Sequence, residues 1–176
     1  QRMTKDIMNR AYITPKRIVT KYAGCKNNLI KDEHYLLERG NGQSEMNRKK
    51  CCIMTSTETE KASLLLDFGS ELHGGLKLVM GSSSRREPSL VRIRFGESVG
   101  EANSTTSNTE WKVGFSTDDH AKRDIIMEIP RDGMIEIGNT GFRFVRLDLL
   151  QNNATISLKE ISAILRYRDI PYLGSF

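Results

Sequence analysis

The clearest pattern along this chain is a period-two alternation of apolar and polar residues, which puts alternate side chains on opposite faces of a β-sheet. The sequence VRIRF at 91–95 alternates apolar residues with arginines and predicts a half-buried strand whose charges face outward. Similar alternation predicts strands at 76–80, 125–129, 145–149 and 161–165, and further strands are expected at 17–22, 50–55 and 63–68.

Turn-forming residues separate these strands and indicate the fold class. They lie at 40–42, 68–70, 81–84, 131–133 and 139–141. Many short strands between turns, with almost no helical periodicity, predict an all-β chain folded as a sandwich or a barrel. The only helices expected are short ones at 5–11 and 31–37.

Two polar stretches interrupt the alternation, at 40–49 and at 100–110, where the sequence reads GEANSTTSNTE. Both are expected to be exposed loops, and loops at one end of a sandwich are where binding usually resides. The 176 residues contain no internal repeat and no interdomain linker, so a single domain is expected.

Composition changes this picture little. The hydrophobic fraction of 38% is ordinary for a globular domain, and no apolar run approaches the roughly 20 residues of a membrane-spanning helix. The net charge of +5 raises the possibility of nucleic-acid binding. The basic residues are dispersed, however, and only 48–50 forms a run of three, so no nucleic-acid partner is expected.

The three cysteines, Cys25, Cys51 and Cys52, do not form a fully paired framework, because their number is odd. At least one is expected to be a small buried hydrophobic residue. No metal-ligand spacing, GxSxG, Walker loop or GxGxxG occurs. The sequence therefore predicts no metal site, no cofactor and no serine nucleophile.

His73 is the most suggestive single residue, because Gly74 and Gly75 follow it and would let a ligand approach closely. The alternative is that these glycines answer a backbone need, such as a β-bulge, and that His73 has no special role.

A second candidate is the polar cluster of Asp118, Asp119 and His120, with Asp124 nearby. Carboxylates and an imidazole at this spacing could bind a cation or the hydroxyl groups of a sugar. The alternative is a loop in which aspartates form turns. These carboxylates, together with Glu97 and Glu101, are too loosely placed to predict a glycosidase pair.

Trp111 is the only tryptophan and follows the polar stretch 100–110. An exposed indole would provide a flat platform for a sugar ring. The alternative is an anchor in the core or at its rim, because tryptophan is highly buried on average.

Six segments, in this order and spacing, resemble the N-terminal region of bacterial α-L-rhamnosidase-like glycoside hydrolases. They read YITPKRIV at 12–19, LDFG at 66–69, LHGG at 72–75, RIRFGES at 92–98, GFRFVR at 141–146 and YRDIP at 167–171. The resemblance covers nearly the whole chain, and its specificity lies in the combination rather than in any single motif.

The resemblance implies a jelly-roll type β-sandwich of two antiparallel sheets, which in that family precedes a catalytic (α/α)-barrel carrying the acidic catalytic residues. It implies a tail at 1–11, the sandwich at 12–170, and at 171–176 the start of a connection to such a barrel. On this basis the chain has no catalytic residue and is inactive alone, and its expected partners are the barrel of the same parent chain and a rhamnose-containing glycan. The resemblance further implies a periplasmic or secreted protein.

The alternative is an autonomous carbohydrate-binding module that uses Trp111, His73 and the 118–120 cluster.

Overall fold

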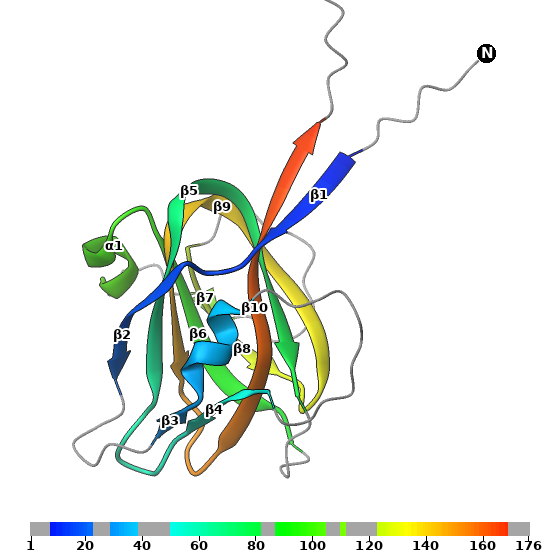
Figure 1. Cartoon of the computed structure of the whole chain (residues 1–176). Helices are drawn as coiled ribbons and strands as arrows, with labels where there is room; N and C mark the ends of the chain where they lie inside the picture. Colours follow the sequence, from blue (N-terminus) through cyan, green and yellow to red (C-terminus); the bar gives the residue numbers. More distant parts are fainter. Residues whose placement is uncertain are drawn as a thin grey trace, which may run out of the picture.

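The computed structural model describes residues 8–22, 29–38, 50–81, 87–104, 110–111 and 123–168, which consist mainly of β-strands (Figure 1). The strands are β1 (Met8–Ile13), β2 (Arg17–Tyr22), β3 (Ile30–Lys31), β4 (Cys52–Thr55), β5 (Ser63–Met80), β6 (Ser89–Gly96), β7 (Glu110–Trp111), β8 (Asp124–Ile129), β9 (Gly133–Leu149) and β10 (Thr155–Arg168). The helical elements of this described part are the 3-10 helix η1 (Glu33–Leu37) and the α-helix α1 (Val99–Asn103). The prediction of an all-β sandwich is confirmed.

Two layers of strands share the long strands β5 and β9. In the first layer, β3, β4 and β10 lead to the second half of β5, which pairs with the first half of β9. In the second layer, β2 pairs with the first half of β5, and that half of β5 pairs with the second half of β9. The second half of β9 in turn leads to β6, β8 and β7. Because β5 and β9 belong to both layers, the strands form one continuous sheet rather than two separate sheets.

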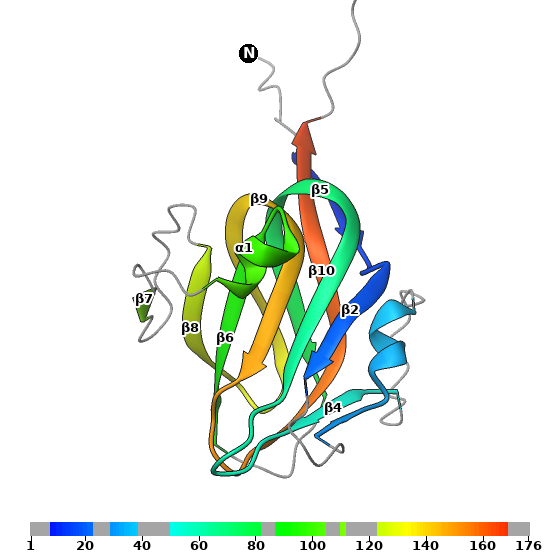
Figure 2. The same cartoon turned by 90° about the vertical axis from the view of Figure 1, so that its left-hand side faces the viewer.

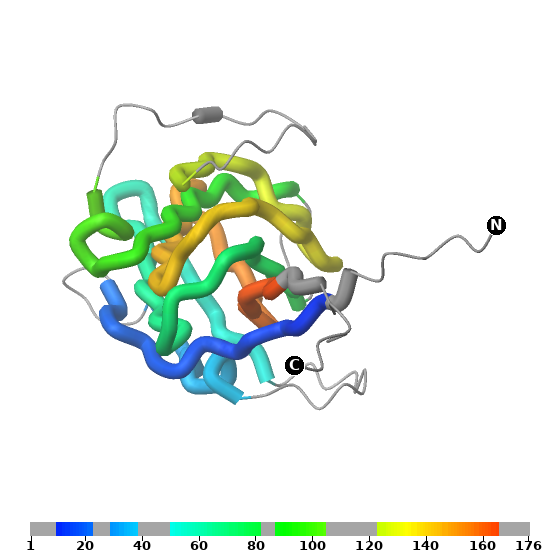
Figure 3. The backbone as a smooth tube through the Cα atoms, turned by 90° about the horizontal axis from the view of Figure 1, so that it is seen from above, coloured from blue at the N-terminus to red at the C-terminus, as the bar shows by residue number. Residues whose placement is uncertain are grey.

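The two long strands bend where they pass between the layers. The register between β5 and β9 breaks from Asp67 to Leu72, and Gly69 lies there with φ of 88°. Gly138 in β9 has φ of 79°, a conformation that glycine adopts without strain. Seen from above, the bent parts of β5 and β9 lie side by side (Figure 3). The predicted separate strands at 63–68 and 76–80 are therefore one strand, because the glycine-containing turn signal marks a bend and not an end.

The core lies between the layers and consists of the inward residues of the alternating segments. At most 1% of each of these side chains is exposed: Leu64, Leu66, Leu76, Leu78, Val91, Ile93, Phe95, Val145 and Leu147. Phe142 contacts Phe68 and Phe95 edge-on, with ring centroids 5.7 and 5.1 Å away. The inward faces that the alternation predicted are thus confirmed.

The two short helices predicted from the sequence have different outcomes. The helix predicted at 5–11 is wrong over residues 8–11, because β1 begins at Met8 and pairs with β10 along its whole length. Long-range pairing outweighs local propensity here. The short helix predicted at 31–37 corresponds to η1.

The cysteine prediction is confirmed by Cys52, which is fully buried in the core, and burial raises the pKa of its thiol to about 12. Cys25 and the stretch 40–49 lie outside the described residues. No helix in the described ranges has the length and apolar character needed to cross a membrane.

Candidate functional site

The outer face of the second layer carries a group of charged side chains at neighbouring ladder positions. Arg94 on β6 lies directly opposite Arg146 on β9, and Arg92 lies opposite Asp148. Two like charges placed opposite each other on one sheet face repel unless an anion lies between them. Asp148 supplies that anion, and it is the acceptor shared by Arg94 and Arg146.

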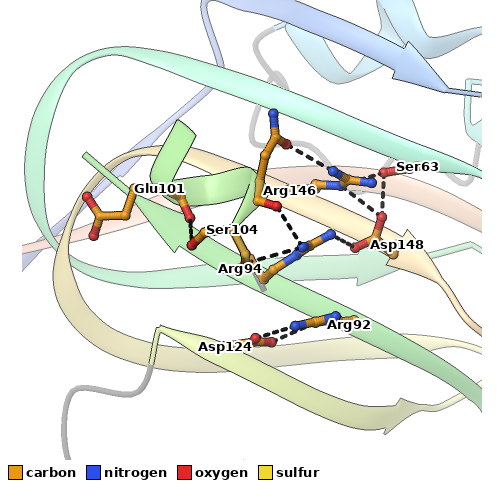
Figure 4. A network of polar contacts seen from close by, with 9 residues as sticks. Ser63, Arg92, Arg94, Glu101, Ser104, Asp124, Arg146 and Asp148 are labelled. Atoms are coloured by element: carbon orange, nitrogen blue, oxygen red, sulfur yellow. Dashed lines mark hydrogen bonds and ion pairs between the residues drawn. The ribbon is translucent and has the colours of Figure 1, made fainter. Parts of the chain in front are cut away.

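The ion pairs of this face form a connected network (Figure 4). Arg94 Nη2 donates to Asp148 Oδ2 at 2.7 Å, and Arg146 Nε donates to Asp148 Oδ1 at 3.0 Å. Ser63 on β5 donates its hydroxyl to the same carboxylate at 2.5 Å and accepts from Arg146 at 3.0 Å. These bonds fix the side chains that project from three adjacent strands.

Arg92 forms a separate pair beside this network. Its guanidinium makes a two-point contact with Asp124 on β8, with donor–acceptor distances of 2.8 and 2.5 Å. The hydrogen bond to Asp124 raises the pKa of Arg92 above its ordinary value. Paired guanidinium and carboxylate groups of this kind hold their geometry well.

Helix α1 covers one end of the network, and Figure 2 shows it in front of β6 and β9. The chain turns into α1 after Gly96, where a Cβ atom would lie 2.5 Å from the backbone nitrogen of Ala102. Ser98 caps the helix by accepting a bond from the backbone of Glu101. Ala102 packs against Leu65 and Phe144 in a small apolar cluster on this outer face.

The end of α1 satisfies part of the arginine network. Arg94 Nη1 donates to the backbone carbonyls of Asn103 and Ser104 at 3.3 and 3.4 Å. The side-chain oxygen of Asn103 accepts from Arg146 Nη1 at 3.0 Å. As a result Arg94 and Asp148 are buried although they face outward, with side-chain exposures of 7% and 9%.

An open groove with a volume of about 570 Å³ lies over this network, and we call it the outer-face groove. It is lined by Tyr22, Thr59, Glu60, Lys61, Ser63, Arg92, Arg94, Arg146, Asp148 and Leu150. Tyr22, at the end of β2, is 59% exposed. A smaller hollow of about 130 Å³ also borders Tyr22 and Arg146, on the side of Leu65 and Asn103. The groove thus combines an exposed aromatic ring with several hydrogen-bonding side chains, as ligand sites commonly do.

A second ionic cluster lies beside the bend of β5 and consists of Arg17, Asp67 and Arg143; we call it the corner cluster. The Asp67 carboxylate accepts from Arg143 Nε at 2.9 Å, from Arg17 Nε at 2.8 Å and from the backbone of Gly69 at 2.8 Å. The bonds from Arg143, with those from Gly69 and Arg17, hold the pKa of Asp67 well below its usual range, although burial opposes this. The corner cluster therefore ties β2, β5 and β9 together at the bend.

The five predicted site residues lie elsewhere or outside the described part. His73 is exposed on β5, where the strand pairs with Gly141 of β9, and it does not line the outer-face groove. Trp111 lies in β7, paired with β8 in parallel, and its side chain is outside the described part. Asp118, Asp119 and His120 also lie outside it.

The glycines after His73 support its alternative interpretation. A Cβ atom on Gly74 would lie 1.8 Å from the carbonyl oxygen of Ile164, and one on Gly75 would lie 2.7 Å from that of Gly138. The register between β5 and β9 also shifts after Gly74. Both glycines are therefore explained by the close approach of neighbouring backbone and by the register shift, and not by a ligand.

Sequence reasoning did not find the outer-face groove. The signal lies in the outward arginines of RIRF and in Arg146 of GFRFVR, but in the sequence alone these positions are indistinguishable from dispersed charge. Pairing of β6 with β9 brings residues 52 positions apart into direct opposition. Tyr22 gave no signal, since its place beside the groove depends on β2 joining the edge of β5.

Comparison with known proteins gives matches in structure alone. No family model matches the sequence, and no curated protein matches it. The rhamnosidase from Klebsiella oxytoca with rhamnose bound matches with a TM-score of 0.55 and 15% identity, over 92% of this chain and 30% of its own. The C-terminal domain of a chitobiase from Bacteroides fragilis matches with a TM-score of 0.51 and 11% identity, over 91% of this chain and 100% of its own.

A fucose binding module from Streptococcus pneumoniae matches with a TM-score of 0.50 and 9% identity, over 87% of this chain and 96% of its own. At these identities the likeness shows the fold, which is a β-sandwich of a kind found in proteins that act on or bind carbohydrates. This chain spans less than a third of the length of the rhamnosidase.

Proposed function

We propose that this chain is a non-catalytic module of a glycoside hydrolase, and that the parent enzyme is an α-L-rhamnosidase. The observation that carries the proposal is the match to the Klebsiella oxytoca rhamnosidase, which covers 92% of this chain. The six segments that resemble rhamnosidases support it independently, because their order is a property of the sequence and not of the fold. In this proposal the sandwich is of the jelly-roll type, the parent is periplasmic or secreted, and the module packs on a catalytic (α/α)-barrel.

The resembling segments also contribute to the ionic clusters of the structure. RIRFGES supplies Arg92, Arg94 and the cap of α1, and GFRFVR supplies Arg143 and Arg146. LDFG supplies Asp67 and Gly69 at the bend of β5. These segments thus shape the bend and the outer face, as expected of a module whose geometry supports a neighbouring domain.

Activity of the parent enzyme tests the proposal. The parent reading frame is expressed with and without residues 12–170, and hydrolysis of p-nitrophenyl α-L-rhamnopyranoside is measured together with thermal unfolding. We expect activity in the whole protein, reduced activity and stability after the deletion, and no hydrolysis by this chain alone. A parent without rhamnosidase activity would contradict the rhamnosidase assignment.

Carbohydrate binding by the module itself is the second candidate, and the outer-face groove with the exposed ring of Tyr22 favours it. The residues predicted from the sequence, Trp111, His73, Asp118, Asp119 and His120, stay candidate sugar contacts in this proposal. Titration of the chain with rhamnose-containing oligosaccharides, followed by amide chemical shifts, tests it. Shifts around Tyr22 or Trp111 would support binding, and an unchanged spectrum at millimolar ligand would contradict it.

A further inference from the structure

We infer that the outer-face groove binds the carboxylate of an acidic sugar, that is, a glycan containing uronic acid. The inference rests on the proposed carbohydrate-binding role and names the ligand class for that site. Its basis is the charge of the groove: four cationic side chains line it, Lys61, Arg92, Arg94 and Arg146, against Glu60 and Asp148 in the lining and Asp124 paired with Arg92 beside it. A concave surface with excess positive charge concentrates anions.

The positive charge of the groove is only partly neutralised within the described residues. Asp148 is the single carboxylate that contacts both Arg94 and Arg146. One negative charge therefore serves two guanidinium groups that face each other across the ladder. An additional anion beside Arg146 would relieve the remaining repulsion.

Donors remain for such an anion. Arg94 Nε is buried and has no hydrogen-bond partner in the described part of the chain, although its side chain lines the groove. An unsatisfied buried donor is costly, and it leaves the positive charge of Arg94 beside the groove incompletely compensated by the described part of the protein. Arg146 uses Nε and Nη1 within the protein and is 28% exposed, and its second terminal nitrogen has no hydrogen-bond partner among the described residues.

Lys61 adds a flexible cation at the rim. Its ammonium group donates to the carbonyl of Thr57 at 3.0 Å and to the side chain of Asn152. An ammonium group has three donors, so one remains beyond these two contacts. Arg146 and Lys61 thus offer two half-buried cations to a ligand in the groove, one planar and one compact.

The rest of the lining favours a sugar over a more highly charged ligand. The ring of Tyr22 offers an apolar face to the C–H surface of a pyranose, and Thr59 and Glu60 offer polar atoms to its hydroxyl groups. Glu60 and Asp148 in the same lining would repel a chain of phosphates. The volume of about 570 Å³ lies within the ordinary range of small-ligand sites.

The test compares three oligosaccharides of matched length by isothermal titration: oligogalacturonate, its methyl ester, and a neutral rhamnose-containing oligosaccharide. A single-stranded oligonucleotide is the fourth ligand. We expect the free acid to bind about tenfold or more tightly than its ester, and binding to weaken as salt rises from about 0.05 M to about 0.5 M. Stronger binding of the oligonucleotide would overturn the assignment to sugars.

Three variants locate the site. Arg146→Gln should weaken oligogalacturonate binding about tenfold or more, because a charge-assisted bond is lost. Lys61→Gln should weaken it about threefold to tenfold, and this rim position lies outside the Asp148 network, so folding is retained. Arg10→Gln removes the same charge from β1, on the other layer, where Arg10 pairs with Glu136, and should leave affinity unchanged.

The outcomes separate this inference from the proposed function. Equal binding of the acid and its ester, or unchanged affinity in both Arg146→Gln and Lys61→Gln, would overturn the carboxylate site while carbohydrate binding stands. Absence of binding by all three oligosaccharides would overturn both the site and the carbohydrate-binding role. The rhamnosidase assignment is judged separately, from hydrolysis by the parent enzyme.

Discussion

The corner cluster and the outer-face groove are both built from arginines and aspartates, but the corner cluster buries only its carboxylate, whereas the groove buries both partners of an ion pair. In the corner cluster the carboxylate of Asp67 is inside, at 2% exposure, and its partners Arg17 and Arg143 reach in from solvent. In the groove the guanidinium of Arg94 is inside, and its carboxylate partner Asp148 is equally buried. The two regions therefore respond differently when a partner is removed.

The difference separates a structural contact from a candidate binding site. Asp67 has three sets of donors around it, including the backbone of Gly69, so it is fully satisfied by the protein. Arg94 keeps a buried donor without a partner in the described residues and lies beside an open groove. A satisfied buried carboxylate stabilises a bend, whereas the arginine beside the groove keeps a donor that the described part of the protein does not use.

The largest effect is expected for Asp148→Asn. This change leaves the buried guanidinium of Arg94 without its anion, and removing one partner of a buried pair costs about 3–5 kcal/mol. Urea unfolding should show this loss as a lower midpoint with an unchanged slope. Asp132→Asn, in the exposed turn before β9, is the matched control and should change the free energy of unfolding by less than about 0.5 kcal/mol.

A double variant decides whether the unpaired charge is the cause. Replacing the pair by apolar residues, in Arg94→Met with Asp148→Leu, should recover most of the loss, because neither charge is then buried. If the double variant is less stable than Asp148→Asn alone, the cost comes from packing or from Ser63, and the contrast between the two regions fails.

A smaller loss is expected for Asp67→Asn in the corner cluster. The arginines that lose their partner are exposed, at 60% and 40%, and return to water without a buried charge. The loss is then limited to hydrogen bonds with a charged group, about 1.5–3 kcal/mol. Measured in the same urea assay, a loss larger than that of Asp148→Asn would reverse the comparison.

Local pattern was sufficient for the strands of both regions but not for their bends. The alternation in VRIRF placed Val91, Ile93 and Phe95 inward, and the structure buries all three. The passage of β5 from one layer to the other was missed, because Gly69 gives the same turn signal whether a strand ends or bends. Only pairing with β9 on both sides of the bend distinguishes the two cases.

The groove was beyond prediction for a related reason. Arg94 and Arg146 each follow the ordinary outward pattern of a half-buried strand. Arg94 is buried because the last residues of α1 fold back over it, and Asn103 of α1 also contacts Arg146. The opposition of the two arginines results from the register of β6 against β9. Both depend on contacts between distant segments, which a period-two pattern does not contain.

The smallest effect concerns pH and belongs to the corner cluster. The folded-state pKa of Asp67 lies below its ordinary value, mainly through its bonds with Arg143. Ionised Asp67 therefore contributes its full stability above the unfolded-state pKa of about 3.9 and loses it as pH falls toward the folded-state pKa. The difference in unfolding free energy between wild type and Asp67→Asn should be constant from about pH 7 to about pH 5 and should shrink below about pH 4.

Urea unfolding of both proteins across this range measures the difference directly, and subtraction removes the titration of the other carboxylates. A difference that stays constant down to about pH 3 would mean that the pKa of Asp67 is the same in the folded and unfolded states, and the corner cluster would then hold the bend by geometry rather than by charge.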